Sequence, residues 1–238
     1  MLIYLDLETT GLEKNDRLCS VGCIAVDGDT TQTFSELIKP PKKIRPEASA
    51  IHHISNEMVK EASLFKKSDI AQWLQEHNNV DNILICHNID FDLKMLEKEG
   101  FVWQGGMIDT LKCTKHLIQE IDRFALQYLR YELRLYKTED EAAEKMGITL
   151  QAHTALSDAF HVMALHHYLS DIADDDVLQE LTQECALVTK FNFGKYSGRY
   201  IEEIARHDSG YLEWMLENMF DMDSDLRYSV KYYLKEVR

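Results

Sequence analysis

Two acidic side chains with strand spacing follow the first apolar segment of the chain. Leu2 to Leu5 is a short run of residues that favour strands, and Asp6-Leu7-Glu8 comes directly after it. Residues two apart on a strand face the same side, so Asp6 and Glu8 would present their carboxylates together. Two like charges so placed repel each other unless a cation neutralises them, and oxygen ligands favour Mg²⁺ or Mn²⁺. A strand at the edge of a sheet with two solvated acids would give the same pattern, so the pair alone does not distinguish a metal site from an exposed strand.

A third carboxylate follows a second apolar run, 82–86. His87-Asn88-Ile89-Asp90-Phe91-Asp92 leads from this predicted buried strand into a predicted helix. Asp92 stands where the helix would start, so it either caps the helix or points toward cations held by Asp6 and Glu8. Asp90 is a rival for the second role, and spacing alone does not separate the two.

The last such group is His153 and Asp158, five residues apart at the start of a predicted helix. Asp158 lies on the helix opposite an apolar face, and His153 lies at the helix entrance. Histidine has an unperturbed pKa of about 6.5 and accepts a proton from water near neutral pH. A surface histidine and an ordinary helix acid would look the same if this pair stood alone.

The surrounding elements predict how these groups are positioned. Residues 18–26 and 31–38 read as strands that pair back as an antiparallel meander, and 82–86 and 107–109 read as further strands. Helices are predicted at 55–60, 68–76, 92–100, 110–119, 138–146 and 153–170. Pro40, Pro41 and Pro46, with basic residues between them, predict an extended basic loop. Strands followed by helices after an opening meander indicate an α/β fold with a mixed sheet.

The C-terminal part of the chain has a different character. Residues 171–186 contain six acids and no lysine or arginine, which predicts an acidic helical connector after a domain at 1–170. Residues 187–238 read as a small α-rich unit with two amphipathic helices, around 211–216 and 226–234.

Composition limits the class of protein. The chain has 238 residues and a formal net charge of −15, which argues against a protein that coats nucleic acid nonspecifically. An enzyme that binds one strand end through metal ions remains compatible with that charge. The sequence has no apolar run of 18 residues and no N-terminal basic and apolar leader, and its five cysteines are scattered. We therefore expect a cytoplasmic protein with reduced thiols and no membrane partner.

Three motifs, in order, carry a family resemblance. Residues 6–11 read D-x-E-T-T-G, residues 87–92 read H-N-x-x-F-D, and residues 153–158 read H-x-A-x-x-D. In these motifs the chain resembles the DEDD family of 3′–5′ exonucleases, in its histidine-bearing, DnaQ-like branch (DEDDh). The second motif selects Asp92 over Asp90. The resemblance implies a ribonuclease H-like mixed sheet flanked by helices.

The resemblance also implies a mechanism. Two divalent cations, Mg²⁺ or Mn²⁺, would be held by four carboxylates. His153 would be the general base, and nucleoside 5′-monophosphates would be released from a 3′ end. The four expected ligands are Asp6, Glu8, Asp92 and Asp158.

Substrate contacts are expected from the same comparison. Thr10, Gly11 and Leu12 resemble the segment that accepts the terminal nucleotide, with Leu12 as a wedge against a base. His53 and Phe91 are expected beside the sugar or base. Residues 50–54, 191–198 and 208–214 resemble the exodeoxyribonuclease X group, which implies DNA as the preferred substrate. The segment between Lys115 and Gln151 does not match well.

Several alternatives stay open at this point. An RNA exonuclease of the RNase T or oligoribonuclease type would share the motifs, because no residue shows how a 2′-hydroxyl is read. A polymerase proofreading subunit would use residues 187–238 for docking. An inactive nucleic-acid-binding protein is the alternative of another class. A homodimer and a polymerase or repair partner are likewise undecided, as is whether the tail stacks on single strands.

Overall fold

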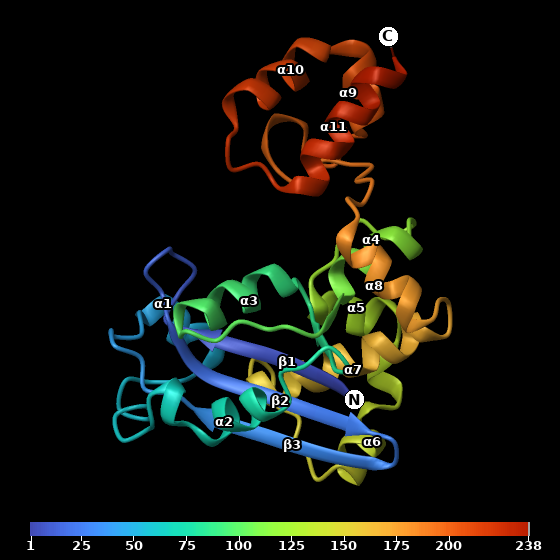
Figure 1. The fold of residues 1–238 in the computed structure, drawn as a ribbon. Helices are drawn as coiled ribbons and strands as arrows, with labels where there is room; N and C mark the ends of the chain where they lie inside the picture. The colour runs from blue at the N-terminus through green and yellow to red at the C-terminus, as the bar shows by residue number, and fades with distance from the viewer. Residues whose placement is uncertain (238) are drawn as a thin grey trace.

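The computed structural model describes residues 1–237 and contains one mixed five-stranded sheet, with strand order β3-β2-β1-β4-β5 (Figure 1). The strands are β1 (Leu2–Thr9), β2 (Leu18–Asp27), β3 (Thr30–Leu37), β4 (Ile83–Cys86) and β5 (Gly106–Asp109). The first three form an antiparallel meander, whereas β4 and β5 run parallel to β1. The predicted α/β fold with a mixed sheet is therefore confirmed.

Alternation along β1 separates two hydrophobic cores, one on each face of the sheet. Ile3, Leu5 and Leu7 are buried against α2 (Asp69–Glu76) and α3 (Ile89–Lys98). Tyr4 faces the other way, into a second core built with helices between residues 110 and 183. Because side chains alternate along a strand, Asp6 and Glu8 share the face of Tyr4.

The helices on this second face cover the sheet between β2 and β5. They are α4 (Thr110–Leu117), α5 (Leu126–Glu132), α6 (Glu139–Lys145), α7 (Ala155–Ser170) and α8 (Asp175–Gln183). The predicted acidic connector contains α8, which packs against β5 and buries Leu178 completely in the same core. Part of the segment 171–186 thus packs on the sheet, in addition to connecting it to the C-terminal unit.

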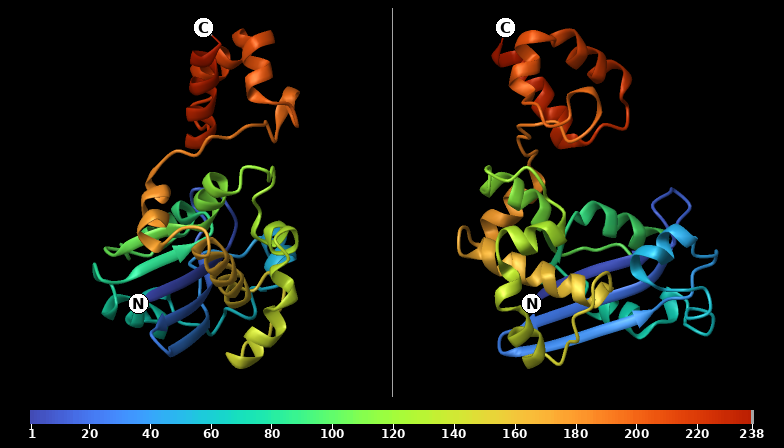
Figure 2. Two further views of the ribbon diagram at one scale, coloured as in Figure 1. Left: turned by 90° about the vertical axis from the view of Figure 1, so that its right-hand side faces the viewer. Right: turned by 180° about the vertical axis from the view of Figure 1, so that it is seen from behind.

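A third hydrophobic cluster lies in the C-terminal part of the chain. Its helices are α9 (Ile201–His207), α10 (Ser209–Asn218) and α11 (Ser224–Glu236), one more than the two predicted. All three views show this group at one end of the molecule, joined to the rest by an extended segment (Figures 1 and 2). A nearly buried ion pair, 2.6 Å between Lys115 Nζ and Asp225 Oδ2, ties α11 to α4.

Some local predictions were wrong. Residues 55–60 form turns instead of a helix, and the helix lies earlier, at α1 (Pro46–His52). Pro46 occupies the first helical position, where a missing N–H costs no hydrogen bond, so this proline starts a helix and does not prevent one. The helix α5 was not predicted. Short 3₁₀ turns lie at Phe65–Lys67, Leu135–Lys137 and Gly194–Tyr196.

The part of the chain that the structure describes contains no helix with both the length and the apolar character needed to cross a bilayer.

Candidate active site

β1 carries two of the expected carboxylates. The strand extends through Thr9 and does not end before Asp6, so both acids belong to its hydrogen-bonded ladder. β4 ends at Cys86 beside β1, and the chain then enters α3, which brings the 87–92 segment to the same end of the sheet. The sheet topology thus brings the first two motifs together at the carboxyl ends of β1 and β4.

The third motif reaches β1 because of a glycine on β2. Gly22 is the register partner of Asp6, and residues directly opposite on antiparallel strands face the same side. A Cβ on Gly22 would lie 2.1 Å from the backbone carbonyl carbon of Ala155 and 2.1 Å from the backbone nitrogen of Leu156. The absence of a side chain at Gly22 therefore lets the first turn of α7 rest directly on the sheet, with Asp158 above Asp6.

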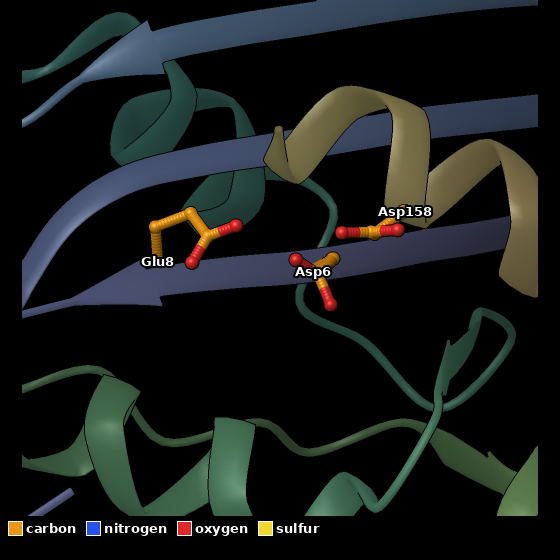
Figure 3. Close-up of side chains that lie close together, drawn as sticks. All are labelled: Asp6, Glu8 and Asp158. Carbon is orange, nitrogen blue, oxygen red and sulfur yellow. The ribbon is translucent and has the colours of Figure 1, made fainter. Parts of the chain in front are cut away.

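Asp6, Glu8 and Asp158 converge as a result. Each offers a carboxylate oxygen, and these oxygens lie within 4.8 Å of one another. Figure 3 shows Asp6 and Glu8 on β1 and Asp158 facing them from α7. Burial, followed by the charge of Asp158, raises the pKa of Glu8 to about 8. Burial also raises the pKa of Asp6 well above its usual range, and the neighbouring carboxylates add to that shift, Asp92 foremost.

Asp92 lies just behind this group. The structure places it in the first turn of α3 and gives the N-cap position to Asn88, so the capping alternative for Asp92 is wrong. Its side chain is buried, and burial followed by the charge of Asp109 raises its pKa well above the usual range. Asp92 and Asp6 are close enough for each negative charge to disfavour the other, as expected of carboxylates around one cation site.

The donor set fits a hard divalent cation. Within residues 1–237, none of the ion pairs made by lysine and arginine involves Asp6, Glu8, Asp92 or Asp158. The ring nitrogen Nδ1 of His161 lies 3.5 Å from Asp158 Oδ1. Partly buried carboxylates that lie within a few ångströms of one another destabilise the fold unless a positive charge lies between them. Oxygen ligands alone select Mg²⁺ or Mn²⁺ over softer ions. Asp6, Glu8 and Asp158, backed by Asp92, are therefore the residues that could hold metal.

The two motif histidines have different environments. His87 donates from Nε2 to the Phe124 carbonyl at 2.6 Å and places Nδ1 2.9 Å from Thr110 Oγ1. Burial lowers the pKa of His87 to about 4, so it stays neutral and fixed. His153 is exposed on the turn before α7, outside the helix in which it was expected, with a left-handed φ of 58°. The structure does not bring His153 into the carboxylate cluster, but its exposed ring is the one available to a bound substrate.

A groove beside Glu8 contains some of the expected substrate residues. Gly11, Leu12 and Phe91 line it, and Leu12 is 81% exposed, as a wedge would be. Thr10 does not line it, because its buried hydroxyl donates to Asp16. Further residues that line the groove include Thr9, Arg45, Ile51 and His52.

The geometry of α1 gives the adjacent histidines His52 and His53 different surroundings. His52 lines the groove, whereas His53 is exposed at the helix end with a φ of 61°. His52 is buried, with its Nε2 3.1 Å from the Thr9 carbonyl. The preceding helix could have distinguished the two histidines, had it been predicted.

The basic loop is folded back onto the first motif. Asp16 accepts hydrogen bonds from Thr10, Lys42 and Arg45. Although burial alone would raise its pKa, these contacts hold the pKa of Asp16 below its usual range. Lys42 and Arg45 thus fix the turn at Gly11, whereas the side chain of Lys43 is exposed.

Two further site residues had no motif to reveal them. Asp109 accepts hydrogen bonds from the backbone of Asn88 and Leu111, so it shapes the 87–92 segment. Its place at the end of the predicted strand 107–109 was the available signal. Gln127 donates to Asp158 from the segment between Lys115 and Gln151, where no motif pointed to it.

Comparison with known proteins agrees with this geometry. Residues 3–166 match a family model described as Exonuclease, and residues 191–220 match one described as Exodeoxyribonuclease X-like C-terminal. Exodeoxyribonuclease 10 of Escherichia coli K12 is 30% identical over 249 aligned positions, covering 99% of each chain. The chain belongs to the exonuclease family. The DNA polymerase III epsilon subunit of Treponema pallidum is a more distant relative, 27% identical over 75% of this chain and 86% of that protein.

Solved structures support the fold. An exonuclease X in complex with 5′ overhanging duplex DNA superposes with a TM-score of 0.60 at 21% identity, covering 76% of this chain and 99% of that one. Exonuclease I of E. coli with a dA16 oligonucleotide gives 0.55 at 17% identity, over 75% of this chain and 42% of that one. A further E. coli exonuclease I structure contains zinc. The ribonuclease H-like architecture expected from the motifs is confirmed.

Proposed function

We propose that this protein is a 3′–5′ exodeoxyribonuclease that releases nucleoside 5′-monophosphates from DNA ends. The observation that carries the proposal is the convergence of Asp6, Glu8 and Asp158 beside a groove lined by Leu12 and Phe91. The choice of DNA is supported by the likeness to exodeoxyribonuclease 10, which extends over the full chain, including the C-terminal unit.

The carboxylates would hold two divalent cations, Mg²⁺ or Mn²⁺, through Asp6, Glu8, Asp92 and Asp158. Bound there, the cations would lower the pKa of water and stabilise the departing oxyanion. The protein's part is to keep these oxygens uncompensated by lysine or arginine and partly shielded from solvent. Asp158 is buried on the first turn of α7, and Asp6 and Glu8 are half-buried, which provides that environment.

His153 is assigned as the general base. An imidazole nitrogen accepts a proton from the attacking water, the water oxygen bonds to phosphorus, and the bond from phosphorus to the 3′ oxygen breaks. The 3′ oxygen then remains on the shortened strand, and the phosphate leaves on the 5′ carbon of the released nucleoside. His87 is unsuited to this step, because both its ring nitrogens are engaged within the fold.

The groove residues would set the position of the terminal nucleotide. Leu12 presents an exposed apolar side chain, and Phe91 offers an aromatic face beside it. Stacking of a base on an aromatic ring contributes about 1–3 kcal/mol and does not depend on sequence. Gly11 would let the strand end approach the backbone. His53 stays a predicted contact, with His52 the alternative that the groove favours.

The test compares matched oligonucleotides labelled at the 3′ or the 5′ end, as DNA or RNA, single- or double-stranded, with Mg²⁺. We expect immediate release of 3′ label as a mononucleotide, a descending ladder from 5′-labelled DNA, and neither product with Asp6→Ala. Degradation of RNA alone would contradict the DNA assignment and place the protein with the ribonucleases. Cleavage by Asp6→Ala at the wild-type rate would contradict the site.

A further inference from the structure

Asp158 is held by a side chain from outside the three motifs. Gln127 Nε2 donates to Asp158 Oδ1 at 2.6 Å, which joins α5 to the first turn of α7. The bond is partly buried, and it acts on one of the three carboxylates that converge. Hydrogen bonds to ligating carboxylates orient them, and loss of such a bond commonly weakens metal binding.

The amide of Gln127 is itself fixed in orientation. Its Oε1 accepts from Arg130 Nη1 at 3.2 Å, and the guanidinium of Arg130 also donates to both carboxylate oxygens of Glu139 on α6. Arg130 and Glu139 have side-chain exposures of 18% and 6%. The oxygen of the amide is therefore directed toward Arg130, and the NH₂ group must face α7.

His161, one turn after Asp158 on α7, also contacts the Gln127 amide. Gln127 Nε2 lies 3.2 Å from His161 Nδ1, so the two amide hydrogens reach Asp158 and His161. His161 Nε2 has no hydrogen-bond partner within the described residues, and it lies 3.6 Å from Glu139 Oε2. Three helices thus share the orientation of one carboxylate.

The chemistry of an amide suits this position. Arg130 contacts Gln127 and not Asp158, and its charge is neutralised by Glu139. A lysine or arginine in direct contact with Asp158 would compete with a metal ion for the carboxylate. An amide donor orients the carboxylate without cancelling its charge, so the negative potential at the cluster is preserved.

We propose that Gln127 is a positioning residue of the active site, which holds Asp158 in the orientation that ligates a divalent cation. Arg130, Glu139 and His161 set the direction of its amide. This inference rests on the proposed function, because it concerns the same site, but it makes a separate claim about metal affinity in the absence of DNA.

The experiment measures Mn²⁺ binding to the full-length protein without substrate, by calorimetry or by loss of the free Mn²⁺ signal in electron paramagnetic resonance. Gln127→Met keeps the length of the side chain and removes both polar groups, and Gln127→Ala is a second variant in case the first is poorly folded. We expect Mn²⁺ to bind about 10- to 100-fold more weakly in either variant. The matched control is Gln72→Met, at an exposed glutamine on α2.

A double-mutant cycle separates positioning from general damage to the fold. In an Asp158→Asn background, Gln127→Met should cause no further loss of Mn²⁺ affinity, because the carboxylate that it orients is gone. An equal additional loss would overturn the proposal, and so would wild-type Mn²⁺ affinity in a folded Gln127→Met protein. Weaker Mn²⁺ binding in the variant, with no nuclease activity in the wild type, would sustain the role of Gln127 while refuting the proposed function.

Discussion

Asp6 and Gly22 are register partners on β1 and β2, and the missing side chain of Gly22 is what allows α7 to deliver Asp158 to Asp6. A methyl group on Gly22 would collide with backbone atoms of α7, which cannot rotate away as a side chain would. The helix start would have to move, and the carboxylate of Asp158 would move with it.

Gly22→Ala should therefore lower both stability and metal affinity. We expect a loss of about 1–3 kcal/mol in the free energy of unfolding, typical of overpacking, measured by urea denaturation in EDTA. The rise in melting temperature on adding Mn²⁺ should shrink as well. Gly210→Ala, on α10, is the matched control, since a Cβ there meets nothing within 4 Å and the backbone is helical. Equal effects of the two substitutions would contradict the packing argument.

Asp92 should be essential where Asp90 is not. Asp92 is buried beside Asp6, whereas Asp90 is exposed on the same helix. Stabilisation by a metal is worth several kcal/mol, so Asp92→Asn should reduce turnover by about 10²-fold or more. Asp90→Asn should stay within about 2-fold of wild type, since it removes an exposed charge. Equal losses from both substitutions, in steady-state assays at saturating Mg²⁺, would undo this assignment.

His153→Ala should slow turnover with little effect on folding. A general base contributes about 10²–10⁴-fold, and the exposed ring of His153 makes no packing contribution to α7. The value of kcat should fall while the melting temperature stays within about 2 °C of wild type. His207→Ala, at an exposed histidine on α9, provides the control. Wild-type kcat in purified His153→Ala would remove it from the mechanism.

Much of the site could be predicted from the sequence because its ligands follow local rules. Strand alternation places Asp6 beside Glu8, and the motif pattern selects Asp92. Gln127 could not be found this way, because its role depends on a long-range contact with Asp158 from a segment without a recognisable pattern. The helix α1 was missed because proline is compatible both with a helix start and with an extended loop, and that error also hid the different surroundings of His52 and His53.

The metal-free protein should lose stability as pH rises from about 4.5 to about 8. Burial raises the pKa of Glu8 to about 8, so the folded state keeps a proton that the unfolded state releases above about 4.5. Where the folded state binds more protons, unfolding becomes easier as pH increases, and the raised pKa of Asp6 acts in the same direction. The measurement is the urea midpoint against pH in EDTA, compared with Glu8→Gln, which should flatten the slope. An unchanged slope in Glu8→Gln would show that Glu8 ionises normally.

The C-terminal unit should contribute little stacking energy to DNA binding. Its cations Lys190, Lys195 and Arg199 each pair with an acid, namely Asp122, Asp208 and Glu203. Phe191 is buried, and Tyr196 and Tyr211 pack against the same small core. Trp214 is half exposed, so its ring is accessible to a base. Base stacking contributes about 1–3 kcal/mol, so a real platform would lose about 5- to 150-fold in affinity with Trp214→Ala. We expect less than about 2-fold, measured by fluorescence anisotropy with a single-stranded oligonucleotide in Ca²⁺. A loss of about 5-fold or more would instead make this unit a single-strand binding surface.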